Sequence, residues 1–284
     1  MEKIPFYKFD GAGNDFVVVD NRTACRQYGE EEVAHLCHRR FGVGADGFMT
    51  LERVDSGECV VDSICDHELP TTHCPLPTYD FEMKYYNSDG RLGSMCGNGG
   101  RCIAAFAHIL GLGDRFHFLG YDGPHDAEIL AWDKEQRVGI VKLGMRSIET
   151  ASVKRVLDGW FLDTGSPHYV QRVVDLAHYD VVGEGRRLRN RTDIFPEGTN
   201  VDFIEDLPDG RLAIRTYERG VEDETWACGT GVTASAIVSG NHRMVARGGD
   251  FKVTFDATST AYENVCLIGP VALNFTGEWT SSAQ

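Results

Sequence analysis

Two segments of the chain share one pattern, in which a Cys-Gly pair and a second glycine run into an alanine-rich apolar stretch. They are Cys96-Gly97-Asn98-Gly99 and Cys228-Gly229-Thr230-Gly231, and in both an alanine stands eight positions after the cysteine. Glycine lets the backbone approach a ligand closely, and the free N–H groups at the start of a helix bind anions. We therefore predict two loop-to-helix units, with helices over 98–110 and 230–239, each presenting a thiol whose pKa is lowered by the helix N-terminus.

The scarcity of polar residues in these two helices restricts the fold. The first has almost no polar face beyond Arg101 and His108, and a helix that is apolar on nearly all sides is buried. A further, amphipathic helix is expected over 30–41. Strand-like segments fill most of the remaining chain, at 7–9, 16–20, 48–53, 81–87, 116–120, 127–132, 137–143, 160–163, 168–174, 200–205, 211–218, 251–256, 262–268 and 271–276.

These patterns indicate an α+β fold of two pseudo-symmetric halves, each a mostly antiparallel β-sheet or barrel wrapped around a central buried helix. We place the halves at residues 1–142 and 143–269, and we expect the C-terminal strand at 270–284 to return to the first half. The cleft in which the two helix N-termini meet is the expected active site.

The landmarks of the two halves are not equally spaced. Gly13 and Gly165, which open comparable turns, are 152 residues apart, whereas the two cysteines are 132 residues apart. The first half therefore contains roughly twenty extra residues, and the Pro-, Cys- and His-rich segment at about 55–80 is the candidate insert. Its thiols and imidazoles lack the paired spacing of structural zinc sites, so we predict a surface loop and no metal site at Cys59, Cys65, His67, His73 and Cys74.

Composition argues against several classes of protein. The 284 residues are 42% hydrophobic, enough for one large or two medium cores, and carry a formal charge of −15, which argues against nucleic acid or an anionic membrane as a partner. No apolar stretch approaches membrane-spanning length, and no signal peptide is expected. Nine cysteines without regular spacing suit a reducing cytoplasm better than a disulfide framework. We expect a cytoplasmic enzyme, with a homodimer as its ordinary state.

Several motifs in order along the chain resemble one family. Asn87-Ser88-Asp89-Gly90 followed by Cys96-Gly97-Asn98-Gly99-Gly100-Arg101 is similar to the signature of the diaminopimelate epimerases. The resemblance covers nearly the whole chain and extends to the segments 11–16, 42–47, 167–168, 199–200, 217–220 and 227–231. It implies an isomerase that needs no cofactor and converts the small molecule L,L-2,6-diaminopimelate to the meso isomer, in lysine and peptidoglycan-precursor biosynthesis.

The chemistry that this resemblance implies requires two acid/base groups. Inverting an α-carbon means removing its proton on one face and returning a proton on the other. In the family the pair would be Cys96 and Cys228, which would exchange roles with the direction of reaction and titrate as a coupled pair. By the same resemblance, His168 and Glu218 would lie next to the cysteines and tune their protonation.

Without a pyridoxal cofactor, the protein itself must stabilise the negative charge that develops on the substrate. The N–H groups of Gly97, Asn98, Gly229 and Thr230 are placed to bind the α-carboxylate, with the dipoles of both helices favouring its charge. The resemblance assigns the distal carboxylate to Arg219, by bidentate pairing, with further contacts from Glu218. Amide contacts to the substrate are implied for Asn14, Asn87 and Asn200.

One position in this set departs from the family. Ser166 stands where the family usually has asparagine before Pro-His, which shortens the reach of the side chain and makes contact with the distal end of the substrate less certain. A related cofactor-independent racemase of another amino acid, such as histidine, is therefore an alternative. A thiol redox or metal-binding protein on the same scaffold is a second alternative, suggested by the nine cysteines and the insert.

Overall fold

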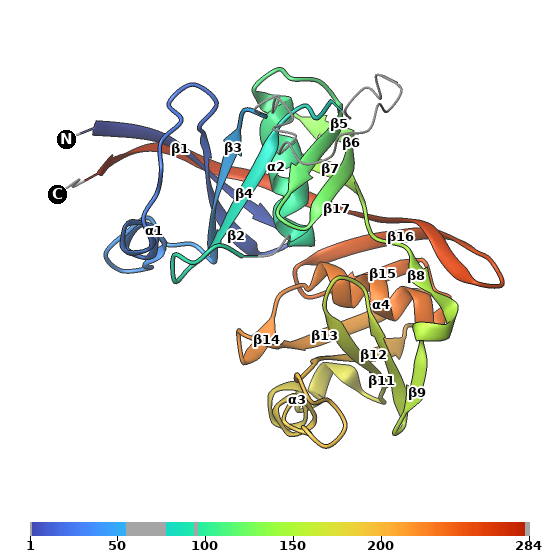
Figure 1. Cartoon of the computed structure of the whole chain (residues 1–284). Coiled ribbons are helices and arrows are strands. Elements are labelled where there is room, and N and C mark those ends of the chain that lie inside the picture. Colours follow the sequence, from blue (N-terminus) through green and yellow to red (C-terminus); the bar gives the residue numbers. More distant parts are fainter. Residues whose placement is uncertain (1, 55–77, 94–95, 282–284) are drawn as a thin grey trace, which may run out of the picture.

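The computed structural model describes residues 2–54, 78–93 and 96–281. Most of the predicted insert at 55–80, with the Cys and His residues considered as ligands, lies outside these residues. The chain forms two bodies, an upper one in blue and green and a lower one in yellow and orange (Figure 1). The last strand, in red, runs along both.

The first half is a closed ring of strands around one helix. Helix α2 (Gly97–Ile109) lies inside the ring, and α1 (Glu30–Cys37) connects β2 to β3 on the outside. Each strand pairs with the next in the following order, and the last pairs with the first: β1 (Glu2–Gly11), β2 (Asn14–Asp20), β3 (Gly47–Glu52), β4 (Glu82–Asn87), β5 (Arg115–Gly120), β6 (Gly123–Asp133), β7 (Val138–Gly144) and β17 (Ala261–Ser281).

The second half has a similar series of strands around helix α4 (Gly229–Ser239), and α3 (Val181–Arg189) connects β11 to β12. A short strand, β14 (Asp223–Thr225), pairs with β13, and 3-10 turns occur at Thr150–Ser152 and Leu176–His178. The strands that surround α4 pair in the order β9 (Lys154–Val156), β10 (Gly159–Asp163), β11 (Pro167–Arg172), β12 (Asn200–Asp206), β13 (Leu212–Glu218), β15 (Arg243–Ala246), β16 (Gly249–Ala257), β17 and β8 (Ile148–Glu149).

The pairing directions show that the two halves are built alike. In the first half, α1 connects the parallel strands β2 and β3, and α2 connects the parallel strands β4 and β5. In the second half, α3 connects the parallel strands β11 and β12, and α4 lies in the connection between the parallel strands β13 and β15. The predicted fold class, two pseudo-symmetric mostly antiparallel halves around buried helices, is confirmed.

Each half has its own hydrophobic core, built on its central helix. In α2 every residue from Gly97 to Ala107 is buried, because its alanines allow the surrounding strands to approach on all sides. Cys102, Ile103 and Phe106 pack with aromatic and aliphatic residues of the ring strands. The buried alanines and Val232 of α4 pack in the same way in a second, separate core.

Two predicted elements end differently in the structure. The helix expected over 30–41 ends at Cys37, because the backbone N–H groups of Val43 and Gly44 turn back to bond the Leu36 carbonyl. Gly44 has a φ of +80°, which favours glycine in this turn. The strands expected at 262–268 and 271–276 form the single strand β17.

Helix α3 was absent from the prediction. Its nine residues include two glycines and a charged, polar face, so the apolar periodicity is weak. In the structure the helix begins after the N-cap residue Asp180, whose side chain accepts a 2.9 Å hydrogen bond from the backbone N–H of Gly183.

Strand β17 belongs to both halves. It pairs with β1 and β7 in the first half and with β16 and β8 in the second. The chain therefore crosses between the halves twice, once after β7 and once within β17. Within the described residues, no helix is long and apolar enough to cross a membrane.

Candidate active site

The two cysteines stand at the N-caps of the two buried helices, Cys96 before α2 and Cys228 before α4. The first turns of these helices touch each other, because a Cβ built on Gly229 would lie 3.5 Å from the Cα of Gly97. It would also lie 2.9 Å from a methyl carbon of Leu267. Glycine at these two positions therefore lets the helix N-termini meet where the halves join.

Burial raises the pKa of both thiols, Cys96 and Cys228, which corrects the lowered pKa predicted from the helix N-termini. The charge of Glu218 acts in the same direction on both thiols. Backbone N–H groups of the first helical turn oppose the shift, but their effect is smaller than the cost of removing a thiolate from water. Each thiol therefore needs a proton acceptor within reach if it is to act as a base.

Amide side chains hold Cys96 and tie the two halves together. The Asn14 side-chain oxygen accepts from the thiol of Cys96 at 3.7 Å and from the Asn98 amide at 3.4 Å. Asn98 also donates to the carbonyl of Ala227 at 2.8 Å and accepts from the Arg101 guanidinium at 3.0 Å. The side chain of Asn98 is thus fully engaged by protein groups, and only its backbone N–H is left for a ligand.

A second group of polar side chains lies beside Cys228. The Thr230 hydroxyl is 3.3 Å from the Cys228 sulfur and 2.9 Å from Nε2 of His168. Ser166 lies 3.0 Å from the same ring nitrogen, and the opposite nitrogen, Nδ1, is 2.7 Å from the Asp202 carboxylate. His168 and Asp202 are fully buried.

Asn200 and Arg219 extend this group. The Asn200 amide donates to Ser166 and to the carbonyl of Pro167, and its oxygen accepts from the backbone N–H of Arg219 at 2.8 Å. The Arg219 guanidinium donates to the carbonyl of Glu197 and stays partly exposed. Ser166 therefore lies among the groups beside Cys228, and the Asn200 side chain links β11 to the backbone of Arg219.

Glu218 and Asn87 lie at the ends of two strands. Burial raises the pKa of Glu218, which lies at the end of β13. Asn87 is exposed at the end of β4. In the described parts of the chain, no side-chain hydrogen bond is made by Asn87.

Asp202 and Asp46 are site residues that the sequence analysis missed. Asp46 accepts a 2.8 Å hydrogen bond from the Asn14 amide. Asp202 follows Asn200 by two residues on β12, and alternate residues of a strand share one face. The two-residue repeat of a strand could have predicted Asp202, because a strand that presents Asn200 to the site presents residue 202 on the same face.

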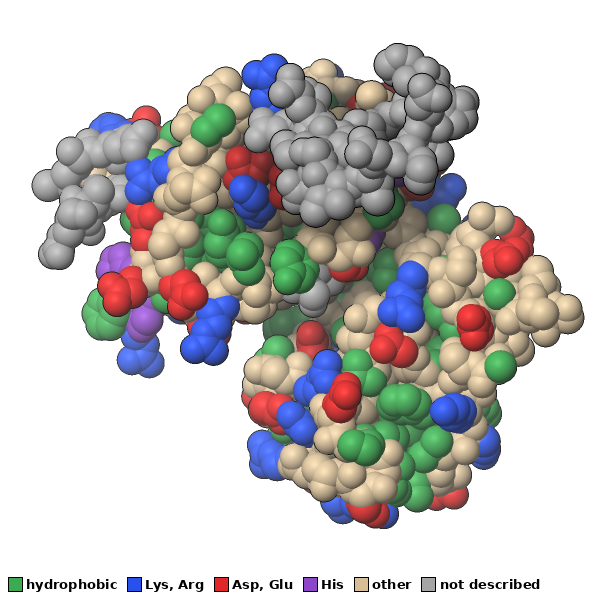
Figure 2. Space-filling model, viewed as in Figure 1, with side chains coloured by type: hydrophobic (Ala, Val, Ile, Leu, Met, Phe, Trp, Pro, Cys, Tyr) green, Lys and Arg blue, Asp and Glu red, His purple; other side chains and the backbone are tan. Residues whose placement is uncertain are grey.

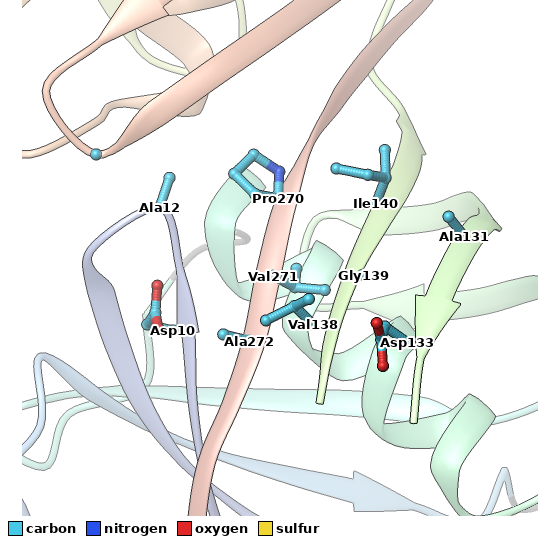
Figure 3. Close-up of a pocket in the computed structure, with 11 residues that line it drawn as sticks. Asp10, Ala12, Ala131, Asp133, Val138, Gly139, Ile140, Pro270, Val271 and Ala272 are labelled. Carbon is cyan, nitrogen blue, oxygen red and sulfur yellow. The ribbon is translucent and has the colours of Figure 1, made fainter. Parts of the chain in front are cut away.

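The surface is hollowed between the two halves on the face shown in Figure 2, where acidic and basic side chains are scattered without a patch of one sign. Another hollow lies on β1, β6, β7 and β17 (Figure 3). Its wall is mainly aliphatic, with the carboxylates of Asp10 and Asp133 beside it, and it contains none of the predicted site residues. Within the described ranges, His, Cys, Asp and Glu side chains form no cluster of three or more that could hold a metal ion.

Comparison with known proteins identifies the relatives of this chain. The sequence profile described as diaminopimelate epimerase matches residues 6–144 and 160–263. A protein named diaminopimelate epimerase from Flavobacterium psychrophilum is 38% identical over 281 residues, covering 95% of this chain and 97% of its own. One of the same name from Chlorobaculum tepidum is 40% identical over 232 residues, covering 81% and 80%.

The fold is shared more widely than the sequence. A crystal structure described as a probable proline racemase from Agrobacterium radiobacter K84 superposes with a TM-score of 0.67 over 99% of this chain and 93% of that one. Its sequence identity to this chain is 14%.

Proposed function

The chain belongs to the diaminopimelate epimerase family, and we propose that it is an isomerase that converts L,L-2,6-diaminopimelate to the meso isomer by a two-base mechanism. The reaction would serve lysine and peptidoglycan-precursor biosynthesis and use no cofactor. The observation that carries the proposal is the contact between α2 and α4 at Gly97 and Gly229, each directly after a cysteine. A substrate carbon bound at this junction would have a thiol on either side.

The inversion needs one thiolate and one thiol. The thiolate removes the α-proton from one face, and the opposite thiol returns its own proton to the other face. The product leaves the two cysteines with their protonation states exchanged, so Cys96 and Cys228 alternate as base and acid with the direction of reaction.

The helix N-termini support the negative charge of the transition state. The backbone N–H groups of Gly97, Asn98, Gly229 and Thr230 belong to the first turns, where helical N–H groups have no intrahelical partner. An α-carboxylate bound there is stabilised by both helix dipoles as negative charge spreads from the carbon.

The remaining site residues select the substrate and set the protonation of the thiols. We propose that Arg219 pairs with the distal carboxylate, with contacts from Asn14, Asn87, Asn200, Ser166 and Glu218. His168 and Glu218 are proposed to tune the thiols, which is supported by the charge of Glu218 acting on both.

The proposal extends to assembly and location. We propose a cytoplasmic homodimer. We also keep residues 1–142 with 270–284, and residues 143–269, as its two domains. Pairing of β17 with β1 supports the assignment of the C-terminal strand to the first domain.

Deuterium uptake tests the function directly. Purified, reduced protein is incubated in D₂O with L,L-diaminopimelate, and the α-carbons and the isomer composition are followed by NMR and chiral chromatography. We expect meso product carrying deuterium at one α-carbon, and none with Cys96→Ala. Absence of label from diaminopimelate, with label appearing on another amino acid such as histidine, would contradict the proposed substrate.

A further inference from the structure

We propose that the Thr230 hydroxyl is a catalytic proton relay between Cys228 and His168, and that Asp202 is the positioning residue that directs His168 toward this relay. The inference rests on the proposed function, since it assigns the path by which one of the two thiols gives up and regains its proton. The four residues come from three neighbouring elements of the second half, β11, β12 and α4 (Figure 1).

The atoms form a continuous line of hydrogen-bonding distances. The Cys228 sulfur lies 3.3 Å from the Thr230 oxygen, and that oxygen lies 2.9 Å from Nε2 of His168. On the other side of the ring, Nδ1 lies 2.7 Å from Oδ2 of Asp202. Among the described residues, no hydrogen bond joins the His168 ring directly to the Cys228 sulfur, whereas Thr230 bonds both, so Thr230 is the connecting group.

Asp202 determines which nitrogen of His168 carries a proton. A carboxylate can only accept hydrogen bonds, and Oδ1 of Asp202 already accepts from the Thr216 hydroxyl at 2.7 Å. Oδ2 therefore accepts from Nδ1–H of His168. The neutral ring then presents the lone pair of Nε2 to the relay, and the carboxylate stabilises the imidazolium that forms when Nε2 takes a proton.

Ser166 gives the relay a second arrangement. Its hydroxyl is 3.0 Å from Nε2 of His168 and 3.1 Å from the Thr230 oxygen, and the Asn200 amide donates to it at 3.2 Å. Nε2 has one lone pair, so only one hydroxyl donates to it at a time. When Ser166 donates to the ring, Thr230 is free to donate to a thiolate at Cys228.

The proton balance closes within these groups. The S–H proton of Cys228 passes to the Thr230 oxygen while the hydroxyl proton of Thr230 passes to Nε2 of His168. The result is a thiolate, an intact threonine hydroxyl and an imidazolium paired with Asp202. The reverse transfer restores the thiol, so no other reactant is consumed.

The first half lacks these groups at the equivalent positions. In the register of the parallel strands, Phe16 stands on β2 where His168 stands on β11, and Met49 stands on β3 where Asp202 stands on β12. The pair that faces α4 is titratable, whereas the pair that faces α2 is apolar. The relay therefore serves only one of the two cysteines.

The glycines of the two helices confirm that these pairs are equivalent. A Cβ built on Gly99 would lie 3.1 Å from the sulfur of Met49 and 3.8 Å from the ring of Phe16. A Cβ built on Gly231, at the same helical position, would overlap the Asp202 carboxylate and lie 3.2 Å from the His168 ring. The backbone layout is the same, and only the chemistry of the pair differs.

Thr230→Val tests the relay, because it removes the hydroxyl with little change of shape and keeps the backbone N–H proposed to bind substrate. Thr230→Ser retains the hydroxyl. Thr233→Val is the matched control, since Thr233 is also on α4 and donates to the Gly229 carbonyl outside the relay. The readouts are the pH dependence of iodoacetamide alkylation, resolved by peptide mapping into Cys96 and Cys228, and the steady-state kinetics.

We expect Thr230→Val to raise the apparent pKa of Cys228 alkylation by about one unit, which lowers the reactive thiolate at neutral pH about tenfold. Cys96 in the same molecule serves as the internal reference, and the apparent pKa of its alkylation should change less. Glu218 and Asp202, the charged groups that act on Cys228, are left in place in this variant. We expect kcat to fall about a hundredfold with little change in KM. Thr230→Ser should recover most of the wild-type kcat and most of the wild-type reactivity of Cys228. Thr233→Val should leave the alkylation profile of Cys228 unchanged.

A second variant keeps the test decisive if Thr230→Val does not fold. Asp202→Asn removes the charge that stabilises the imidazolium, and it also removes the direct repulsion between this carboxylate and a thiolate at Cys228. We expect the loss of the relay to outweigh the loss of repulsion, so the apparent pKa of Cys228 alkylation should rise as it does in Thr230→Val. An unchanged Cys228 profile and kcat in the folded variants would overturn the relay. Because alkylation needs no substrate, a wild-type protein that fails to epimerise diaminopimelate would refute the proposed function and leave the relay to be judged on the thiol alone.

Discussion

Asn98 of the first half donates a 2.8 Å hydrogen bond to the carbonyl of Ala227, the residue before Cys228 in the second half. Asn98 lies two residues after Cys96, so a single side chain links the backbones that carry both thiols. The halves are also joined covalently after β7 and through β17, whose Leu267 side chain packs at the two helix N-termini. The Asn98 amide is therefore a device for keeping the two cysteines opposed.

Asn98→Ala should lower both stability and activity. Asn98 is 2% exposed, and the loss of its side chain would take the amide donor from the Ala227 carbonyl and leave the Arg101 guanidinium with the Gly97 carbonyl as its remaining hydrogen-bond acceptor. An unsatisfied buried group costs about 1–3 kcal/mol, measurable as a lower free energy of unfolding in urea. Asn241→Ala is the control, because its amide bonds the Gly210 carbonyl nearer the surface. Equal losses of activity in the two variants would contradict the role of Asn98.

Gly231→Ala should be more damaging than Gly99→Ala, although the two glycines occupy equivalent positions. The new methyl group on α4 would overlap the buried carboxylate of Asp202, whereas the one on α2 meets the flexible end of Met49 at 3.1 Å. Overpacking against a fixed polar pair costs about 1–3 kcal/mol, and displacement of Asp202 should also lower kcat. Thermal unfolding and kinetics of both variants check this, and equal effects would show that the two pockets adapt equally well.

The repeated Cys-Gly segments were sufficient to predict the architecture. An alanine-rich helix without a polar face has to be surrounded, and two such helices with matching N-termini require two similar enclosures. The prediction of β17 as two strands failed because Pro270, a residue that often interrupts strands, pairs with Ile140 without breaking this one. Helix α3 escaped notice because its polar face and two glycines hide the apolar period.

The sequence motifs predicted the members of the candidate site, but they did not predict its electrostatics. Motifs located the cysteines, but the pKa of each thiol depends on how deeply the surrounding strands bury it, which no local pattern records. Likewise the neighbours of Ser166 come from strands and a helix that are distant in sequence. Its contacts with His168 and Thr230 follow from the register of β11 and the start of α4.

Glu218→Gln should make stability less dependent on pH. Burial raises the pKa of Glu218 above its ordinary value of 4.5, so the folded state favours the neutral carboxyl. As pH rises through 4.5, the unfolded chain ionises first, and the wild type loses stability until the folded carboxyl also ionises. Glutamine has no such loss. The Tm of the variant relative to wild type should therefore be higher at pH 8 than at pH 4, and a constant difference would mean that the fold does not raise the pKa of Glu218.

Removing one thiol at a time should separate exchange from inversion. In Cys228→Ala the remaining thiol, Cys96, can take the α-proton of one isomer and return a proton only to the same face, so that isomer exchanges with solvent without inverting. Cys96→Ala should do the same for the opposite configuration. Net epimerisation in each should fall by about 10²–10⁴-fold, the usual contribution of a positioned acid or base. Deuterium incorporation into each purified isomer, measured separately, checks this. Exchange of the same isomer by both variants would contradict the arrangement, because it would mean that the two thiols do not face opposite sides of the carbon.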